Sequence, residues 1–500
     1  MKRIDKIFYG MGRFGSTALL SIVSLATFYI YLKKYELDPW LNGVANGIGK
    51  IVIALSGFFI GYLSDKTIHP KLGRRKPFII SGTFALAISF IMLFLPDFFI
   101  PVKDQLTLFL YETLWVSSFN FFYGYLLTPY QAWLPEITLP EERVEVSGYE
   151  NTFNLLGNIV GIAGSFALPL IIQQGGMLLF YVVVILGIIE ILFYVPAYIR
   201  IQEPKKYIPH PSIIKETLIA IRNKNYVTWI IAQGIMSLGF TILITLILVY
   251  IEDVLLLTGI MYFVFAGVLL VFVVSFFIVW GLMSKKFKIK RTMLSALTIL
   301  VFVLPLTWII GRMPLTIIEA AFIIFVIVSI SAVIVLMKEV SIKSKKNLII
   351  IAITLLYLAW FVSKSTSLFS LIMKGDSLPL LLPIEIQGLI LVTLAAIGLS
   401  GYWLFPYVII AHIAEVDEII TGESRAGMYT GFNSIPLNIF QATAYIITGY
   451  ITGLPNMLGY YLWGPICGVF ILIGMLVFIF VDTDPDFEKL REMYGKKKVS

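Results

Sequence analysis

Long apolar stretches alternate with short polar segments along the whole of this 500-residue chain. Each stretch has about 20 residues, the length that a helix needs to cross the hydrocarbon core of a bilayer. The short segments of alternating polarity that typify membrane β-barrels do not occur. The pattern therefore predicts an all-α polytopic membrane protein with about fourteen spans, near residues 14–32, 41–64, 77–100, 107–130, 147–172, 177–199, 226–250, 258–283, 292–311, 314–337, 347–372, 386–412, 429–453 and 458–481.

The composition excludes a soluble globular protein, because 59% of the residues are hydrophobic, 14% are charged and the mean hydropathy is +0.91. The single cysteine, Cys467, excludes a disulfide framework and a Cys-based metal site, and the three histidines lack ligand-like spacing. An enzyme would need clustered His, Asp or Glu within the spans, or an appended catalytic domain, and the sequence has neither. We therefore expect no metal, no cofactor and no enzymatic activity.

Lysine and arginine gather in every second loop between the predicted spans. With the N-terminus inside, most of the 38 Lys and Arg residues fall on the inner side, which is the bias of the positive-inside rule. The net charge of +8 thus reflects cytoplasmic loops and not nucleic-acid binding. We expect a multi-pass protein of the cell membrane, embedded in the lipid bilayer, with both termini in the cytoplasm.

A polar segment divides the chain into two halves. Residues 201–225 contain Pro204, Pro209 and Pro211, which break helices, and they form the expected cytoplasmic linker. The expected domains are an N-terminal six-helix bundle at 1–200, a C-terminal bundle with two extra helices at 226–481, and a cytoplasmic tail at 482–500.

Two motifs of the first half recur in the second. GYLSDK (61–66) is echoed by GLMSKK (281–286), and LPEITLPEERVEVSGY (134–149) by AEVDEIITGESRAGMY (414–429). The offset between the copies grows by about the length of one helical hairpin. The sequence therefore predicts two pseudo-repeated bundles with an extra hairpin in the second, at 314–372 or within 292–337.

The loop GYLSDKTIHPKLGRRKPF (61–78) places an acid and a basic cluster where two spans meet water. Asp65 ends one span, and Arg74 and Arg75 begin the next, so the loop suits a charge-assisted latch at a cytoplasmic gate. The alternative is a solvated, positively charged inner loop with no latch.

Polar side chains also lie within the spans. Asn151, Asn154 and Asn158 share one helix face, and they must contact either neighbouring helices or a polar cavity. Lys50 is costly inside a span unless it faces water or a partner. The aromatic ring of Trp403 suits stacking against a sugar, although such rings also simply pack.

Four stretches resemble the glycoside–pentoside–hexuronide:cation symporters of the major facilitator superfamily. These are YGMGRFGS (9–16), the loop at 61–78, PYQAWLPEITLPEERVEVSGY (129–149) and AHIAEVDEIITGESRAGMYTG (411–431). The loop at 61–78 is closest to the sucrose transporters in its GRRKPF. The resemblance implies a major facilitator fold, with a sugar bound between two halves that open alternately to either side.

Position by position, the resemblance places the family's sugar site on Thr17, Leu127, Gln131, Asn151, Trp403, Asn433 and Asn438. The family's two sodium-site acids become Ile53 and Gly57, and because a hard cation needs carboxylate oxygens we expect no sodium coupling at the usual place. Proton coupling would then need another acid in or beside a span, and the candidates are Glu112, Glu150, Glu190 and Glu319. Glu150 is our first choice because it lies next to Asn151, although it could also simply pair with a base at the start of its helix.

We therefore predict a monomeric secondary transporter of sugars or glycosides that works by alternating access and is coupled to protons. The alternatives are a cation-independent sugar facilitator and a membrane sensor that transports nothing. The residues expected to line the pathway are Arg13, Thr17, Lys50, Gln131, Asn151, Asn154, Trp403, Asn433 and Asn438. The expected inner gates are Asp65 with Arg74 and Arg75, Glu136 with Arg143, and Glu415 with Arg425.

Overall fold

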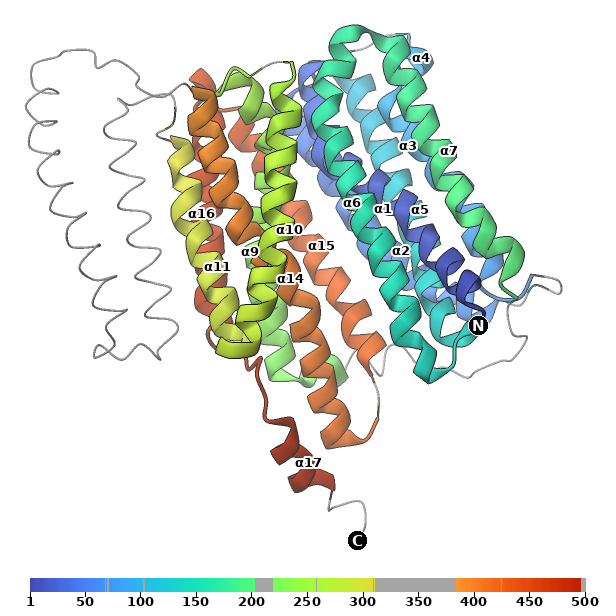
Figure 1. The fold of residues 1–500 in the computed structure, drawn as a ribbon. Helices are drawn as coiled ribbons and strands as arrows, with labels where there is room; N and C mark the ends of the chain where they lie inside the picture. Colours follow the sequence, from blue (N-terminus) through green and yellow to red (C-terminus); the bar gives the residue numbers. More distant parts are fainter. Residues whose placement is uncertain are drawn as a thin grey trace, which may run out of the picture.

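The computed structural model describes residues 1–67, 69, 72–101, 104–202, 219–257, 259–308, 310, 384–423 and 425–495. The predicted insertion at 314–372, Glu319 and most of the linker lie outside these residues, as does the side chain of Asp65. Within the described ranges the chain forms two groups of long helices that stand side by side (Figure 1). The prediction of an all-α polytopic fold is confirmed, whereas the count of about fourteen spans extends beyond the described residues.

The first half contains six long helices, which are α1 (Arg3–Lys33), α2 (Pro39–Lys66), α3 (Lys76–Phe94), α5 (Gln105–Ile137), α6 (Arg143–Gln174) and α7 (Gly176–Arg200). A short helix, α4 (Pro96–Phe99), and the turn η1 (Pro140–Glu142) connect some of them. The helix starts follow from the sequence. Asp38 and Asp104 cap α2 and α5 by accepting hydrogen bonds from backbone N–H groups of the first turn.

The described part of the second half also contains six long helices. They are α9 (Lys224–Asp253), α10 (Met261–Phe287), α11 (Ile289–Val303) with its continuation η2 (Leu304–Trp308), α14 (Ile384–Thr421), α15 (Ala426–Thr452) and α16 (Gly459–Phe478). The turn η3 (Pro455–Met457) precedes α16, and α17 (Phe487–Gly495) follows it as a short helix at the end of the chain. Ten helices of the described chain have the length and apolar composition of a membrane span.

The two halves repeat one packing arrangement. In the first half α1 packs against α6 and α7, and α5 packs against α2 and α3. In the second half α9 packs against α15 and α16, and α14 packs against α10 and α11. This correspondence is that of an internal structural repeat.

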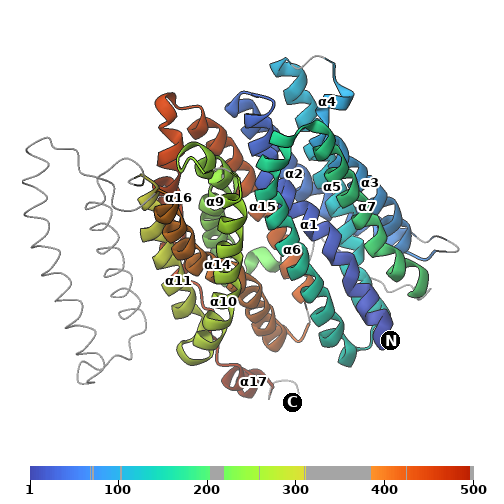
Figure 2. The same ribbon diagram turned by 45° about the horizontal axis from the view of Figure 1, so that its top comes forward.

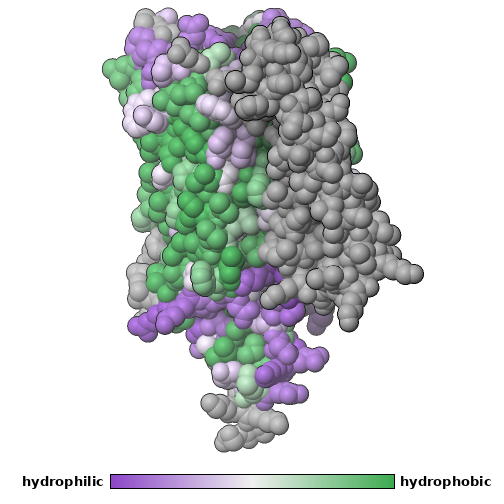
Figure 3. All heavy atoms as spheres, turned by 90° about the vertical axis from the view of Figure 1, so that its left-hand side faces the viewer, coloured by the Kyte–Doolittle hydropathy of each residue, from purple (hydrophilic) through white to green (hydrophobic). Residues whose placement is uncertain are grey.

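Both chain termini lie at the same end of the molecule (Figures 1 and 2). We call this end the terminal side and the opposite end the distal side. One face of the molecule carries a broad hydrophobic belt between two hydrophilic bands (Figure 3). Such a belt is the surface that a helical protein presents to lipid.

Candidate functional site

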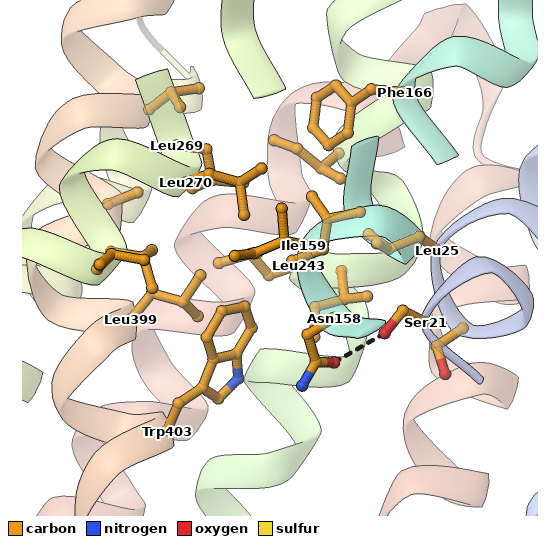
Figure 4. Close-up of a pocket in the computed structure, with 18 of the residues that line it drawn as sticks. Ser21, Leu25, Asn158, Ile159, Phe166, Leu243, Leu269, Leu270, Leu399 and Trp403 are labelled. Atoms are coloured by element: carbon orange, nitrogen blue, oxygen red, sulfur yellow. Dashed lines mark hydrogen bonds between the residues drawn. The ribbon is translucent and has the colours of Figure 1, made fainter. Parts of the chain in front are cut away.

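A cavity of about 470 Å³ lies between the two halves. The first half contributes residues of α1 and α6 to its wall, and the second half contributes residues of α9, α10 and α14 (Figure 4). Its volume is in the range that binds a small organic molecule. A cavity shared by two repeated bundles is the place where a solute could be held during alternating access.

The first half supplies most of the polar groups of the cavity. Asn151, Asn154 and Asn158 of α6 line it together with Ser21 and Ser24 of α1. The amide oxygen of Asn158 accepts a hydrogen bond of 2.8 Å from the hydroxyl of Ser21 (Figure 4). The three asparagines that share a face in the sequence therefore face both the neighbouring helix and the cavity.

Asn154 is held from behind by two residues of α1. Its amide oxygen accepts a hydrogen bond of 2.7 Å from the hydroxyl of Thr17 and a longer one, 3.5 Å, from the guanidinium of Arg13. Neither Thr17 nor Arg13 is among the residues that line the cavity. Both therefore orient an amide of the wall and do not form the wall themselves.

The second half supplies a mainly apolar wall. Leu243 of α9, Leu270 of α10 and Leu399 of α14 face the cavity, and the indole of Trp403 lies near Asn158 (Figure 4). Of the predicted pathway residues, the structure thus brings Asn151, Asn154 and Trp403 together around one cavity.

Four other predicted pathway residues do not line this cavity. Gln131 is exposed on α5, and Asn433 is buried in α15. The amide of Asn438 donates a hydrogen bond to the carbonyl of Ser434 in its own helix. Lys50 lines a second, much smaller cavity beside Asn46 and Asn120. Ser24, which was not among the predicted pathway residues, lines both this small cavity and the large one.

The distal side is closed by contacts between the halves. Lys33 at the end of α1 forms an ion pair with Asp253 at the end of α9, and the hydroxyl of Tyr29 donates to Glu252. This contact was not among those predicted from the sequence. The sequence does contain a signal for it. The first helix of one half ends with a base, Lys33, and the first helix of the other half ends with an acid, Asp253. Two such helix ends attract when the repeats face each other.

At the terminal side, each described ion pair joins residues of the same half. The carboxylate of Glu136 on α5 accepts from Arg74 at 2.5 Å and from Arg75 at 2.8 Å, and the two arginine side chains are only 7% and 2% exposed. The N-terminal amine and Lys6 donate to Glu142 and lower its pKa to about 2. These pairs tie the loops of the first half together.

Two of the predicted gate pairs are wrong in this structure. Glu136 pairs with Arg74 and Arg75, whereas the guanidinium of Arg143 donates to the backbone carbonyl of Pro135. The second-half pair is also different, because Glu415 binds Arg491 and Arg425 binds Asp417 and Glu423. In each predicted pair the acid lies near the end of one helix and the base at the start of the next, so a connecting segment separates them and other partners are within reach.

Three acids lie within the spans of the first half, of which Glu112 and Glu190 are buried and Glu150 is half-buried. Glu150 is 3.5 Å from the guanidinium of Arg13. One oxygen of Glu112 accepts from the amide of Asn46 at 2.8 Å, and the other has no hydrogen-bond partner among the described residues. Neither oxygen of Glu190 has such a partner in the described part of the chain. Among the described residues, Glu150 is thus the acid of this group that pairs with a cation.

Comparison with known proteins adds an independent line of evidence for the fold and family of the chain. The sequence model of a family described as MFS/sugar transport protein matches residues 8–340. An uncharacterized symporter, sll1374, from Synechocystis is 30% identical over 164 residues, 31% of this chain and 29% of the relative. A putative sulfoquinovose importer from Escherichia coli is 28% identical over 160 residues, 31% of this chain and 33% of the relative. The chain thus spans about a third of the length of these relatives.

A solved structure resembles the whole fold. The crystal structure of the nucleoside transporter NupG has a TM-score of 0.57 and 11% sequence identity, with 96% of this chain and 98% of that chain covered. At this identity the likeness concerns the arrangement of the helices alone.

Proposed function

The chain belongs to the family of MFS/sugar transport proteins, as its loops predicted, and from this premise we propose that it carries a sugar or glycoside across the membrane by alternating access. The observation that carries the proposal is the cavity itself. Both halves line it, and among the described residues the ion pair that joins the halves lies on the distal side. A rocking motion of one half against the other would expose such a cavity to either side in turn.

We assign the terminal side to the cytoplasm, because the basic loops lie there and follow the positive-inside rule. The arrangement then corresponds to the inward-facing state of a cell-membrane transporter. A single chain contains both halves and the whole cavity, so we expect a monomer to be sufficient for transport.

The proposed roles follow the position of each residue. Asn151, Asn154 and Trp403 contact the sugar, and Arg13 and Thr17 hold Asn154 in place. Four of the predicted residues would reach the pathway only when the halves reorient, and these are Lys50, Gln131, Asn433 and Asn438. Glu136 and its two arginines fasten the terminal side of the first half, and Asp65 completes that gate in the proposal.

We propose proton coupling through Glu150. In its ionised form this acid lies beside Arg13, which in turn touches Asn154 of the cavity wall. A proton on Glu150 would weaken the ion pair and free Arg13 to move, so the coupling ion and the sugar site would communicate through one guanidinium. The names of the relatives, which include a symporter, support a coupled mechanism.

Uptake by the purified protein in liposomes tests this function. A panel of neutral sugars and glycosides is supplied with and without an imposed pH gradient, together with sulfoquinovose and a hexuronide as charged sugars. We expect accumulation that requires the gradient. Equilibration without accumulation would indicate a facilitator instead, and the absence of any uptake by folded protein would contradict transport.

A further inference from the structure

The cavity has one polar end and one apolar end. Ser21, Asn158 and Trp403 lie toward one end, and Leu25, Leu270 and Phe166 line the part of the cavity beyond them (Figure 4). The polar end also includes Asn154. No charged side chain is among the described residues that line the cavity. The wall therefore changes from hydrogen-bonding groups to hydrocarbon along the length of one continuous pocket.

The polar end offers hydrogen-bond donors. The amide oxygens of Asn154 and Asn158 already accept from Thr17 and Ser21. Within the described part of the chain, the amide nitrogens of these residues and the indole nitrogen of Trp403 donate no hydrogen bond to protein. A ligand that satisfies three such donors must present uncharged or charged acceptor oxygens.

The surroundings favour an uncharged ligand. A carboxylate or sulfonate in the cavity would have no cation in the described wall to pair with, and burying an unpaired charge is costly. Arg13, a cation behind the wall, has its charge balanced by the carboxylate of Glu150 at 3.5 Å, although its Nε and Nη1 atoms have no hydrogen-bond partner among the described residues. The free oxygens of a neutral sugar, in contrast, match the donors at no such cost.

The apolar end is poorly suited to a bare sugar. Hydroxyl groups against Leu243, Leu269 and Leu270 would lose their hydrogen bonds to water without replacement. A hydrocarbon group in the same place would instead gain from removal of its surface from water. We propose that the cavity binds an uncharged glycoside with an apolar aglycone, with the sugar at Asn154, Asn158 and Trp403 and the aglycone in the apolar end. This inference rests on the proposed function and specifies its substrate class.

Binding of a matched series of glycosides tests the inference. The full-length protein is placed in nanodiscs, because maltoside detergents are themselves apolar glycosides. Free sugars, their methyl, propyl, butyl and phenyl glycosides and a hexuronide are compared by calorimetry, and transport of the same compounds is measured separately in liposomes. We expect affinity to rise about threefold to fourfold for each methylene that becomes buried, and the hexuronide to bind more weakly than the neutral sugar.

Two neighbouring residues of α10 provide a matched pair of variants. Leu270 lines the cavity, whereas Val271 is 63% exposed on the outer surface of the helix. Leu270→Trp fills part of the apolar end. It should remove at least the increase in affinity from the propyl to the butyl glycoside, while the affinity for the free sugar falls little. Val271→Trp introduces the same side chain outside the cavity and should leave the whole series unchanged.

The outcomes separate the two proposals. If free sugars are transported and their affinity does not respond to the aglycone, the inference is wrong and the transport function stands. If apolar glycosides bind with the expected trend but are not transported, the substrate class stands and the transport function is wrong. If folded protein binds no member of the series, both are wrong.

Discussion

Gly43 of α2 and Gly449 of α15 lie backbone to backbone across the boundary between the two halves. A Cβ on Gly43 would be 2.9 Å from the Cα of Gly449, and a Cβ on Gly449 would be 3.1 Å from the Cα of Gly43. Neither position has room for a side chain while the distal side is closed. These two glycines thus permit the close approach of two helices that belong to different halves.

Gly43→Val should therefore disfavour closure of the distal side. Overpacking of this kind costs about 1–3 kcal/mol, which shifts a two-state equilibrium by about 5- to 150-fold. We expect slower transport and faster labelling, from the distal side, of a cysteine introduced by Ser24→Cys in the cavity wall. Gly267→Val on α10 is the control, because a Cβ there meets nothing within 4 Å. Equal labelling in both variants would contradict the role of this contact.

Trp403→Ala should abolish uptake while membrane insertion is retained, because the indole supplies both a stacking face and a hydrogen-bond donor to the cavity. Trp403→Phe keeps an aromatic face and loses the donor, so it should retain transport with affinity reduced about fivefold to tenfold. Uptake kinetics in liposomes distinguish the two variants. Undiminished transport by Trp403→Ala would remove the indole from the sugar site.

Glu136→Gln should lower the thermal stability of the protein. Removal of one partner from a buried ion pair costs about 3–5 kcal/mol, and the side chains of Arg74 and Arg75 are almost fully buried against this carboxylate. Glu415→Gln is the matched control, since its pair with Arg491 is 41% and 65% exposed and should contribute no more than about 1 kcal/mol. Melting of the purified protein followed by tryptophan fluorescence measures both. Equal midpoints would show that Glu136 does not fasten the terminal side.

Glu150→Gln should separate coupling from transport. The variant cannot exchange a proton at this position, so we expect counterflow of the sugar to persist while accumulation driven by a pH gradient is lost. Glu145→Gln, five residues earlier on α6 and 48% exposed, should accumulate the sugar normally. Gradient-driven accumulation by Glu150→Gln would transfer the coupling role to another acid, with Glu112 and Glu190 as the next variants to test.

The fold was largely predictable, because runs of about 20 apolar residues specify spanning helices without reference to their packing. The polar face of α6 was predictable for a similar reason, since Asn151, Asn154 and Asn158 repeat at helical spacing. The partners of charged groups were harder to predict. Glu136 is seven residues from Arg143, yet it binds arginines more than 60 residues away, because the packing of α3 against α5 decides which bases reach it.

The apolar end of the cavity could not be predicted either. Leu243, Leu270 and Leu399 come from three helices of the second half, and each is the kind of residue expected anywhere in a span. Only the relative placement of those helices shows that they surround a space and do not fill it. Likewise Gln131 and Asn433 matched positions in related sequences, but α5 and α15 orient them away from this cavity.

We expect transport to require the distal contact between the halves to open and close. The most direct test joins the two ends of that contact with a short thiol crosslinker in the double variant Lys33→Cys and Asp253→Cys. The native cysteine, Cys467, is buried, so the unmodified chain and each single variant serve as controls. We predict that complete crosslinking abolishes uptake in liposomes and that cleavage of the crosslink restores it. Full transport by the crosslinked protein would contradict the account.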